Sequence, residues 1–292
     1  MSAAQTQSSS PAHLRGGPAR LVMQSELTSA ARQRLALRDI IDSIRLWRLS
    51  FTLGWFDIRL RYRGSMLGPF WLTLSTAVMV VALGILYAKL FKMEVREYLP
   101  FIAMSLVLWG VLATIIGEAC TCFTQAEGMI RSMRIPYAVH AVRVIVRNMV
   151  VLAHNVLVII AVYALLDVWP GWPVLWTIPG LLVWVVDGLA ICLLLGPIGA
   201  RFRDVPPIIG SVVQIAFFVS PVIWKPELLQ GPAAQLLWVN PFYTLLEIVR
   251  GPLLGEVPNW HVWGSALGYS VVLWIAAWLL FARVRGRLAF WV

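Results

Sequence analysis

The chain passes from a polar into a membrane-sized apolar region at Arg59-Leu60-Arg61-Tyr62-Arg63-Gly64-Ser65-Met66-Leu67-Gly68-Pro69-Phe70-Trp71. Alternating arginines end in a glycine-containing turn, and Pro69 is placed as it would be in the first turn of a helix. We predict membrane spans at residues 68–91, 99–123, 144–166, 175–195, 207–224 and 262–281. Each run is close to the roughly 20 residues that cross the hydrocarbon core. The sequence therefore predicts an all-α, polytopic integral membrane protein with six transmembrane helices.

The composition supports a membrane location. Apolar residues make up 60% of the chain and charged residues 13%, and the mean hydropathy is +0.78. These proportions leave too little polar surface to cover a soluble globule, so the bilayer must be part of the protein's solvent.

The distribution of Lys and Arg predicts the orientation. Ten basic residues precede the first span, four lie at 131–147, two at 201–203 and three after 281, whereas only Lys89, Lys92, Arg96, Lys225 and Arg250 fall on the other side. By the positive-inside rule, both termini are expected in the cytoplasm of a bacterium, with a multi-pass topology in the inner membrane. The net charge of +10 is then mainly an orientation signal. Contact with anionic membrane lipids is a plausible addition, and no soluble basic face for nucleic acid is found.

Two segments precede the spans. Residues 1–29 are rich in Ser, Ala, Gln, Gly and Pro and are expected to form a disordered cytoplasmic tail. Residues 30–66 are expected to hold an amphipathic interface helix and then the cationic strip. The helix is expected from Arg38 to about Ile58, because its apolar side chains recur at steps of three or four. They are Ile40, Ile44, Trp47, Phe51, Trp55 and Ile58. The alternative is a helix packed on the protein's own cytoplasmic surface.

Three stretches resemble one family, the ABC-2 type permeases that export polysaccharides, which are the membrane subunits of O-antigen, capsule and teichoic acid ABC exporters. The first is the stretch from Arg59 to Trp71. The other two are Ala200-Arg201-Phe202-Arg203-Asp204-Val205 leading to Ser220-Pro221-Val222-Ile223-Trp224, and Asn240-Pro241-Phe242-Tyr243 leading to Glu247-Ile248-Val249-Arg250-Gly251-Pro252-Leu253-Leu254-Gly255. The resemblance is closest to the O-antigen branch, and it implies that residues 67–292 form the ABC-2 type six-helix transmembrane domain.

The resemblance implies an ATP-driven exporter of a lipid-linked polysaccharide, built from a homodimer of this permease and two copies of an ABC ATPase subunit. The chain has no GxxxxGK[ST] loop, so ATP and Mg would be bound by the partner ATPase and not by this chain. No acid pair, nucleophile with a base, or His/Cys metal cluster is evident either. We therefore expect no catalytic residue, no metal and no cofactor in this chain, and no enzymatic activity.

The resemblance places the ATPase-coupling helix in residues 127–137. The expected contact residues combine apolar side chains, which fill a groove, with arginines, which pair with carboxylates at its rim. They are Glu127, Gly128, Met129, Ile130, Arg131, Ser132, Met133, Arg134, Ile135 and Pro136. The alternative is an ordinary solvated cytoplasmic loop.

Residues 225–261 are too apolar for an exposed loop and too rich in Pro and Gly for a span. They predict two short re-entrant helices, at about 227–238 and 242–254, which line the external mouth of a pathway. In the resembling exporters the periplasmic gate helices lie here. The alternative is a compact outer cap without a gating role.

Two sets of residues are candidates for substrate contact. Arg59, Arg61 and Arg63 would bind the substrate's pyrophosphate headgroup, unless they only fix the orientation of the first span. Aromatic rings stack on sugar faces, so some of the chain's aromatic residues are candidates for the channel lining, although each is also a candidate for the interfacial belt or the core. These candidates are Phe70, Trp71, Tyr87, Trp109, Phe217 and Phe218.

Glu118, His154 and Asp187 lie within predicted spans, where a charge is costly. They either face a hydrated cavity or pair with one another in the bundle, and structural pairing is the favoured interpretation. Three functional alternatives remain. An ABC-2 exporter of a small lipid or drug would share the fold, a secondary transporter would show internal repeats, and a membrane-embedded glycosyltransferase would carry an acidic cluster in a loop.

Overall fold

The computed structural model describes residues 28–292 except 65, 67 and 69, and these residues form helices and connecting segments without a strand. The predicted tail therefore lies outside the described residues up to residue 27, and the first helix begins at Ser29. The α-helices are α1 Ser29–Arg45, α2 Trp47–Arg61, α3 Phe70–Leu90, α4 Val95–Ala119, α5 Glu127–Ser132, α6 Ala138–Leu166, α7 Thr177–Arg201, α8 Val205–Val219, α9 Pro232–Leu236, α10 Pro241–Leu253, α11 Trp260–Val284 and α12 Leu288–Trp291.

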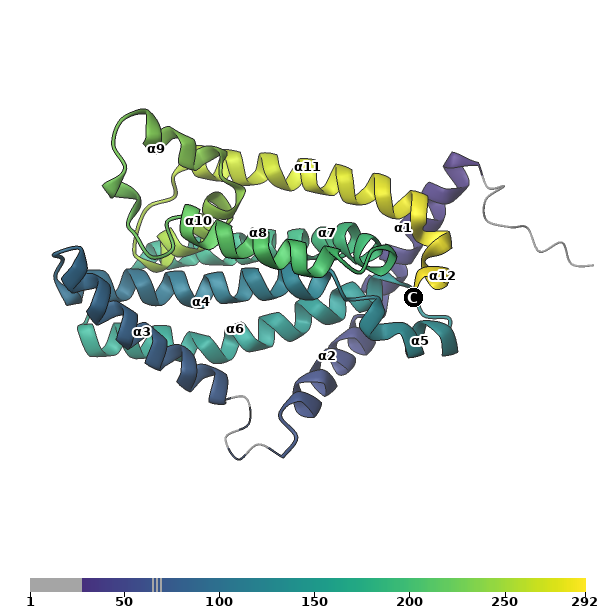
Figure 1. Ribbon diagram of the computed structural model, residues 1–292, viewed down its shortest axis with the longest axis horizontal. Helices are drawn as coiled ribbons and strands as arrows, with labels where there is room; N and C mark the ends of the chain where they lie inside the picture. The colour runs from purple at the N-terminus through teal and green to yellow at the C-terminus, as the bar shows by residue number, and fades with distance from the viewer. Residues whose placement is uncertain (1–27, 65, 67, 69) are drawn as a thin grey trace, which may run out of the picture.

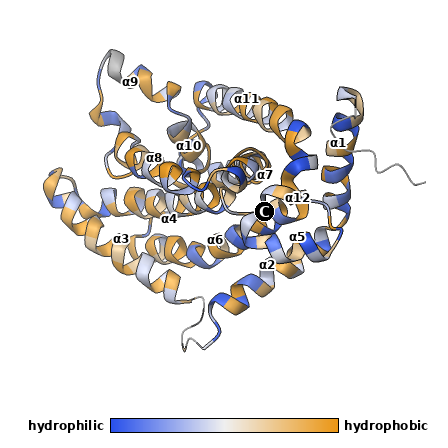
Figure 2. Ribbon diagram, turned by 45° about the vertical axis from the view of Figure 1, so that its right-hand side comes forward, coloured by the Kyte–Doolittle hydropathy of each residue, from blue (hydrophilic) through white to orange (hydrophobic). Residues whose placement is uncertain are grey.

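Short 3-10 helices connect several of these elements. They are η2 Thr124–Ala126, η3 Trp172–Trp176, η4 Pro226–Leu228, η5 Leu237–Val239 and η6 Arg285–Arg287. The long helices form a bundle with α9 at one end and α1, α5 and α12 at the other (Figure 1). We call the end with α1, α2, α5 and α12 the basic end, and the end with α9 and α10 the distal end. Hydrophilic residues gather along α1, α2 and α5, and hydrophobic residues dominate the bundle (Figure 2).

Five helical segments of the described chain are long and apolar enough to cross a membrane: α3, α4, α6, η3 with α7, and α11 with η6 and α12. The predicted span at 207–224 corresponds to α8, which has 15 residues and a length of about 22 Å. It is shorter than predicted because Ser220 adopts extended backbone before Pro221. The ring of a proline disfavours helical geometry in the residue before it.

Helix α4 forms the centre of the bundle and is mostly buried, whereas the other four long segments keep much of their surface exposed. Small residues on α7 allow close helix packing. A Cβ atom at Gly199 would lie 2.0 Å from the carbonyl oxygen of Cys120, and one at Gly180 would lie 2.7 Å from that of Ile248. These glycines therefore bring α7 against the end of α4 and against α10.

The predicted interface helix is two helices, because the chain breaks at Leu46 between α1 and α2. Helix α2 packs its small residues Ser50 and Gly54 against α6, and a Cβ at Gly54 would lie 3.1 Å from Val146. Trp47, Phe51 and Trp55 recur at steps of four on the neighbouring face and are exposed. The chain's own surface therefore leaves this part of the apolar stripe uncovered, as expected of a helix that lies against a membrane interface.

At the distal end, the second predicted re-entrant helix is α10, and its bounds agree with the prediction. The first, expected at 227–238, is instead divided into η4, α9 and η5. Gly231, at φ +66°, and Pro232 interrupt the segment. Proline has no N–H to continue a preceding helix, and the positive φ suits glycine only.

Candidate functional site

The cationic strip lies at the C-terminus of α2. Arg59 and Arg61 belong to its last turn, Arg63 follows it, and all three are exposed. Residues that are two positions apart in a helix point about 200° apart around its axis. Arg59 and Arg61 therefore point in different directions. Burial raises the pKa of the neighbouring Tyr62, so its phenol stays protonated. Cations at a helix C-terminus are favoured by the helix dipole in any case.

Arg61 belongs to a network of charged side chains. Its Nη2 lies 3.0 Å from Glu118 Oε1. The other oxygen of Glu118 accepts hydrogen bonds from Arg147, at 2.6 and 3.1 Å, and from Asn148, at 2.8 Å. A residue of α2 is thereby joined to residues of α4 and α6, which are distant in the sequence.

Asp57 extends this network. It accepts from Arg143 Nε at 2.6 Å and from Arg147 Nη1 at 2.9 Å, and Arg143 Nη2 also contacts it. Arg147 is 7% exposed and bridges both carboxylates. We call Asp57, Arg61, Glu118, Arg143 and Arg147 the charge network. It contains three guanidinium groups and two carboxylates, so it carries one excess positive charge.

The excess charge is most accessible at Arg61. The Arg61 side chain is 47% exposed and contacts its carboxylate through a single nitrogen, whereas the other members are at most 22% exposed. An anion that reaches this edge of the network would meet the Arg61 guanidinium, of which only Nη2 contacts Glu118. Charge-assisted bonds from arginine to phosphate are among the strongest in proteins, and they are often bidentate.

The three polar residues predicted within spans are paired, although not with one another. Glu118 is held in the charge network, and Asp187 accepts a hydrogen bond from Ser270 Oγ at 2.7 Å. His154 Nδ1 lies 2.8 Å from the carbonyl oxygen of Val150, and its ring packs edge-on against Phe70. Glu118 and Asp187 thus have partners on other helices and His154 has one in its own helix, so the prediction that these three pair with one another is wrong.

The predicted coupling segment contains α5, followed by extended backbone at Met133. Arg131 forms an ion pair with Glu127 at 2.9 Å and donates to a backbone oxygen of Val292 at 2.6 and 3.1 Å. Ile130 packs against the hydrophobic core and Met129 is half-buried. Both residues are therefore only partly accessible in a single chain, and their assignment to the coupling helix stays a prediction. Ile135 and Pro136 are half-buried. The exposed surface of the segment is formed by Glu127, Gly128, Arg131, Ser132, Met133 and Arg134.

The aromatic candidates divide into two groups. Trp109 is buried against Phe217 and Phe242, with ring centroids 5.7 and 5.8 Å away, and Tyr87 is half-buried and stacked on Phe91. Phe70, Trp71 and Phe218 are exposed. Within one chain, therefore, Trp109 is a core residue, and the exposed candidates lie on the surfaces of α3 and α8.

A sequence profile of ABC-2 type transporters matches residues 48–254, which is most of the chain. The chain belongs to the ABC-2 type transporter family. The chain is also similar to two proteins named O-antigen export system permease protein RfbA. The Myxococcus xanthus protein is 23% identical over 236 residues, which cover 80% of this chain and 91% of the relative. The Klebsiella pneumoniae protein is 16% identical over 234 residues, which cover 80% of this chain and 90% of that relative.

The distal end of this ABC-2 type transporter is held by a buried arginine of α10. Arg250 was counted among the basic residues on the non-cytoplasmic side, within the second predicted re-entrant helix, and it is fully buried on α10. Its guanidinium contacts Glu247, donates to Ser105 Oγ at 2.9 Å and to the carbonyl oxygen of Pro221 at 2.5 Å, and lies 4.5 Å from the ring centroid of Phe101. A Glu and an Arg three residues apart in an otherwise apolar helix was the available signal.

The segment after α8 is capped from several directions. The carbonyl oxygens of Pro221 and Ile223 accept bonds from Arg250 and from the hydroxyl of Tyr98. Asn240 Nδ2 donates to Ser220 Oγ at 2.9 Å. A break within a membrane helix frees backbone groups that other side chains must satisfy. In this transporter, α4 and α10 satisfy them, so the end of α8 is joined to both.

A second buried carboxylate was also missed. Asp39 of α1 accepts from Arg285 Nε at 2.7 Å and from the backbone N–H of Ala138 at 2.9 Å. Its side chain is completely buried. Asp39 thereby joins the N-terminal helix to the start of α6 and to the segment after α11, at the end of the transporter where α5 also lies.

Proposed function

We propose that this ABC-2 type transporter is the transmembrane permease subunit of an ATP-driven exporter that moves a lipid-linked, O-antigen-like polysaccharide across the bacterial inner membrane. Both relatives described above are named as O-antigen export permeases, and their similarity extends over nearly their whole lengths. Membership of the family supports a transport role and an ATPase partner.

The observation that carries this proposal is the excess positive charge at the end of α2. Arg61 and its neighbours Arg59 and Arg63 lie between a helix with an exposed aromatic stripe and the first membrane-crossing helix. A lipid pyrophosphate travels at the same depth as such an interface helix. Planar guanidinium groups can bind its phosphate oxygens in pairs, which a lysine cannot do.

The proposed assembly is a homodimer with two ATPase copies, with both termini in the cytoplasm. The ATPase binds ATP and Mg, and this chain contributes the exposed surface of α5 and of residues 133–134 as the docking site. ATP binding and hydrolysis in the partner move α5, and this movement shifts α3 and α8, whose exposed aromatic residues line the conduit. The re-entrant region at the distal end forms the exit.

The test is to purify the chain with its co-expressed ATPase and measure ATP hydrolysis in proteoliposomes. We expect a lipid-linked polysaccharide to stimulate hydrolysis, and the same lipid pyrophosphate without a glycan to stimulate it less. Stimulation by small lipids or drugs alone, with no response to the glycan-linked lipid, would favour an ABC-2 exporter of small molecules. Incorporation of sugar from a nucleotide sugar would instead indicate a glycosyltransferase.

A further inference from the structure

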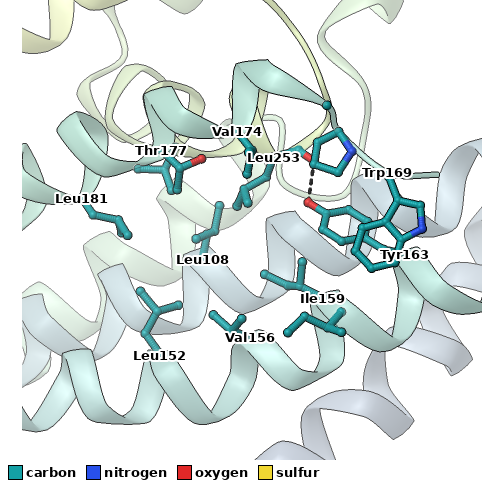
Figure 3. Close-up of a pocket in the computed structure, with 14 residues that line it drawn as sticks. Leu108, Leu152, Val156, Ile159, Tyr163, Trp169, Val174, Thr177, Leu181 and Leu253 are labelled. Atoms are coloured by element: carbon teal, nitrogen blue, oxygen red, sulfur yellow. Dashed lines mark hydrogen bonds between the residues drawn. The ribbon is translucent and has the colours of Figure 1, made fainter. Parts of the chain in front are cut away.

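A cavity of about 610 Å³ opens on the side of the bundle toward the distal end. Leu152, Val156 and Ile159 of α6 point into it from one side, and Leu108, Val174 and Leu181 from the facing elements (Figure 3). Its lining is almost entirely apolar. Ile160 and Trp169 also line it and are 45% and 61% exposed, so the cavity is open at the surface of the bundle.

The depth of the cavity matches one leaflet of a bilayer. Along α6 the lining extends from Leu152 to Tyr163, which lies one turn before the helix ends at Leu166. The rise between Leu152 and Tyr163 is about 16 Å, roughly half the thickness of the hydrocarbon core. The cavity therefore extends from the distal membrane interface to about the middle of the membrane.

Aromatic residues form its outer rim. Tyr163 donates its hydroxyl to the carbonyl oxygen of Leu253 at 2.6 Å (Figure 3), and its ring centroid lies 5.5 Å from that of Trp169. Trp169 and Trp172 are exposed beside it. Exposed Trp next to a Tyr with a satisfied hydroxyl is typical of the level of the lipid headgroups.

A second, polar cavity of about 280 Å³ adjoins the first and shares Tyr163 and Leu253 with it. Four of the charged residues that line it pair with one another: Lys225 with Glu97 at 2.5 Å, and Arg250 with Glu247. Three other charged residues line this polar cavity without an ion pair among the described residues. They are Arg96, Glu227 and Glu256.

These three residues offer one cationic and two anionic groups. Arg96 Nε donates to the carbonyl oxygen of Leu166 at 3.2 Å, which holds the guanidinium at the end of α6 and leaves its terminal nitrogens for another acceptor. A phosphate fits Arg96, and a primary ammonium fits Glu227 or Glu256. A phospholipid that carries both groups complements both signs of charge, whereas an anionic headgroup would complement only one.

We infer that the apolar cavity binds one acyl chain of phosphatidylethanolamine from the leaflet at the distal end, with the headgroup in the adjoining polar cavity. An apolar cavity does not retain water, and its walls lose dispersion contacts if it stays empty. An acyl chain from the surrounding bilayer restores these contacts. Because Val249 and Leu253 of α10 line the cavity, the bound lipid packs α10 against α6 and α7. The inference does not depend on what the protein exports.

The test places the full chain in nanodiscs of equal amounts of phosphatidylethanolamine and phosphatidylglycerol, with a trace of phosphatidylethanolamine that carries a diazirine on its acyl chain. We expect photolabelled peptides to cluster at residues 152–163 and 169–181. Val156→Trp, which fills the cavity, should reduce this labelling severalfold. Leu157→Trp is the matched control, because Leu157 is exposed on the same helix and does not line the cavity. It should leave labelling unchanged.

Three results would overturn the inference. One is equal labelling of the Val156→Trp and unmodified proteins. Another is labelling spread evenly over all lipid-facing helices. The third is conversion of a dimer to a monomer by Val156→Trp with no loss of bound lipid, which would assign the cavity to contact with a second copy of the chain. Correct folding of each variant is checked by its thermal unfolding and elution profile.

The headgroup is tested by native mass spectrometry of the same proteins released from the nanodiscs. Phosphatidylethanolamine should be retained severalfold more than phosphatidylglycerol. Arg96→Gln should lower retention of both lipids. The double change Glu227→Gln and Glu256→Gln should remove the preference while phosphatidylglycerol is still retained. Equal retention of the two lipids by the unmodified protein would contradict the proposed headgroup.

Discussion

At the scale of single residues, arginines that look alike in the sequence have different partners in the structure. Arg147 is buried between two carboxylates, Arg250 is buried on α10, and Arg61 is half exposed with one contact. A buried guanidinium without its carboxylate is costly, whereas an exposed pair contributes little. The degree of burial therefore separates structural arginines from those that remain available to a ligand.

This difference predicts an order of stabilities. Glu118→Gln should lower the free energy of unfolding by about 3–5 kcal/mol, because it leaves Asp57 as the one carboxylate for the three guanidinium groups of the charge network. Arg61→Gln should cost less than about 1 kcal/mol. Thermal unfolding of the detergent-purified variants measures both effects. If Arg61→Gln destabilised the protein as much as Glu118→Gln, Arg61 would be a structural residue and its proposed role in headgroup binding would lose its basis.

Replacement of Arg59, Arg61 and Arg63 together by Lys separates charge from geometry. Lysine keeps the positive charge that orients the first span but lacks the planar fork. We expect normal membrane levels and ATPase co-purification, with polysaccharide export reduced about tenfold, which corresponds to about 1.4 kcal/mol. The matched control replaces Arg34, Arg38 and Arg45, which are also exposed, by Lys. Normal export by the first variant would assign the strip to topology alone.

At the scale of elements, hydropathy was sufficient for most of the bundle. The spans at 68–91, 99–123, 144–166, 175–195 and 262–281 correspond to long helices, because a membrane requires long apolar runs. The break at Leu46 and the early end of α8 were not predicted. The early end of α8 follows from the local effect of Pro221 on Ser220, which a hydropathy pattern does not register because the run stays apolar.

The candidate site was predictable only in part, because its side chains come from helices that are distant in the sequence. The position of the arginines followed from sequence, but their partners Asp57 and Glu118 lie on α2 and α4, and only the tertiary fold brings them together. Arg250 was expected in the second re-entrant helix, but its burial was not predicted because a basic residue is normally exposed. Its burial depends on Ser105 and on the backbone after α8, which are distant in the sequence.

Helix α5 gives a prediction at this scale. Met133 is 50% exposed, whereas Ile130 packs on the core. Met133→Asp should abolish ATPase co-purification and glycan-stimulated hydrolysis without loss of inserted protein, because it charges only the docking surface. Ile130→Asp should instead reduce the amount of folded protein, since it buries a carboxylate without a partner. Full co-purification of the ATPase with the Met133→Asp variant would exclude this surface as the docking site.

At the scale of the whole molecule, buried polar groups connect elements at both ends of the bundle. At the basic end, the charge network joins α2, α4 and α6, and Asp39 joins α1 to the segments around α6 and α11. At the distal end, Arg250 joins α10 to α4 and to the segment after α8. Helix α4 contributes to the connections at both ends and is the most buried of the membrane-crossing helices. A movement at the basic end can therefore reach the distal end through α4 and the helices packed on it.

Arg250 provides the test of this connection. Arg250→Lys keeps a charge beside Glu247, but a lysine's single nitrogen cannot also reach Ser105 and the carbonyl oxygen of Pro221 in the fork geometry of a guanidinium. We expect the variant to insert and to bind the ATPase, because the basic end is unchanged. Its ATP hydrolysis should continue while export falls severalfold, because α10 and the end of α8 no longer move with α4. Lys89→Arg is the matched control, since Lys89 is exposed at the same end. The contrary result would be that Arg250→Lys lowers hydrolysis and export in the same proportion. That result would mean that the contacts of Arg250 do not couple ATP hydrolysis to export, and Arg250 would have only a structural role.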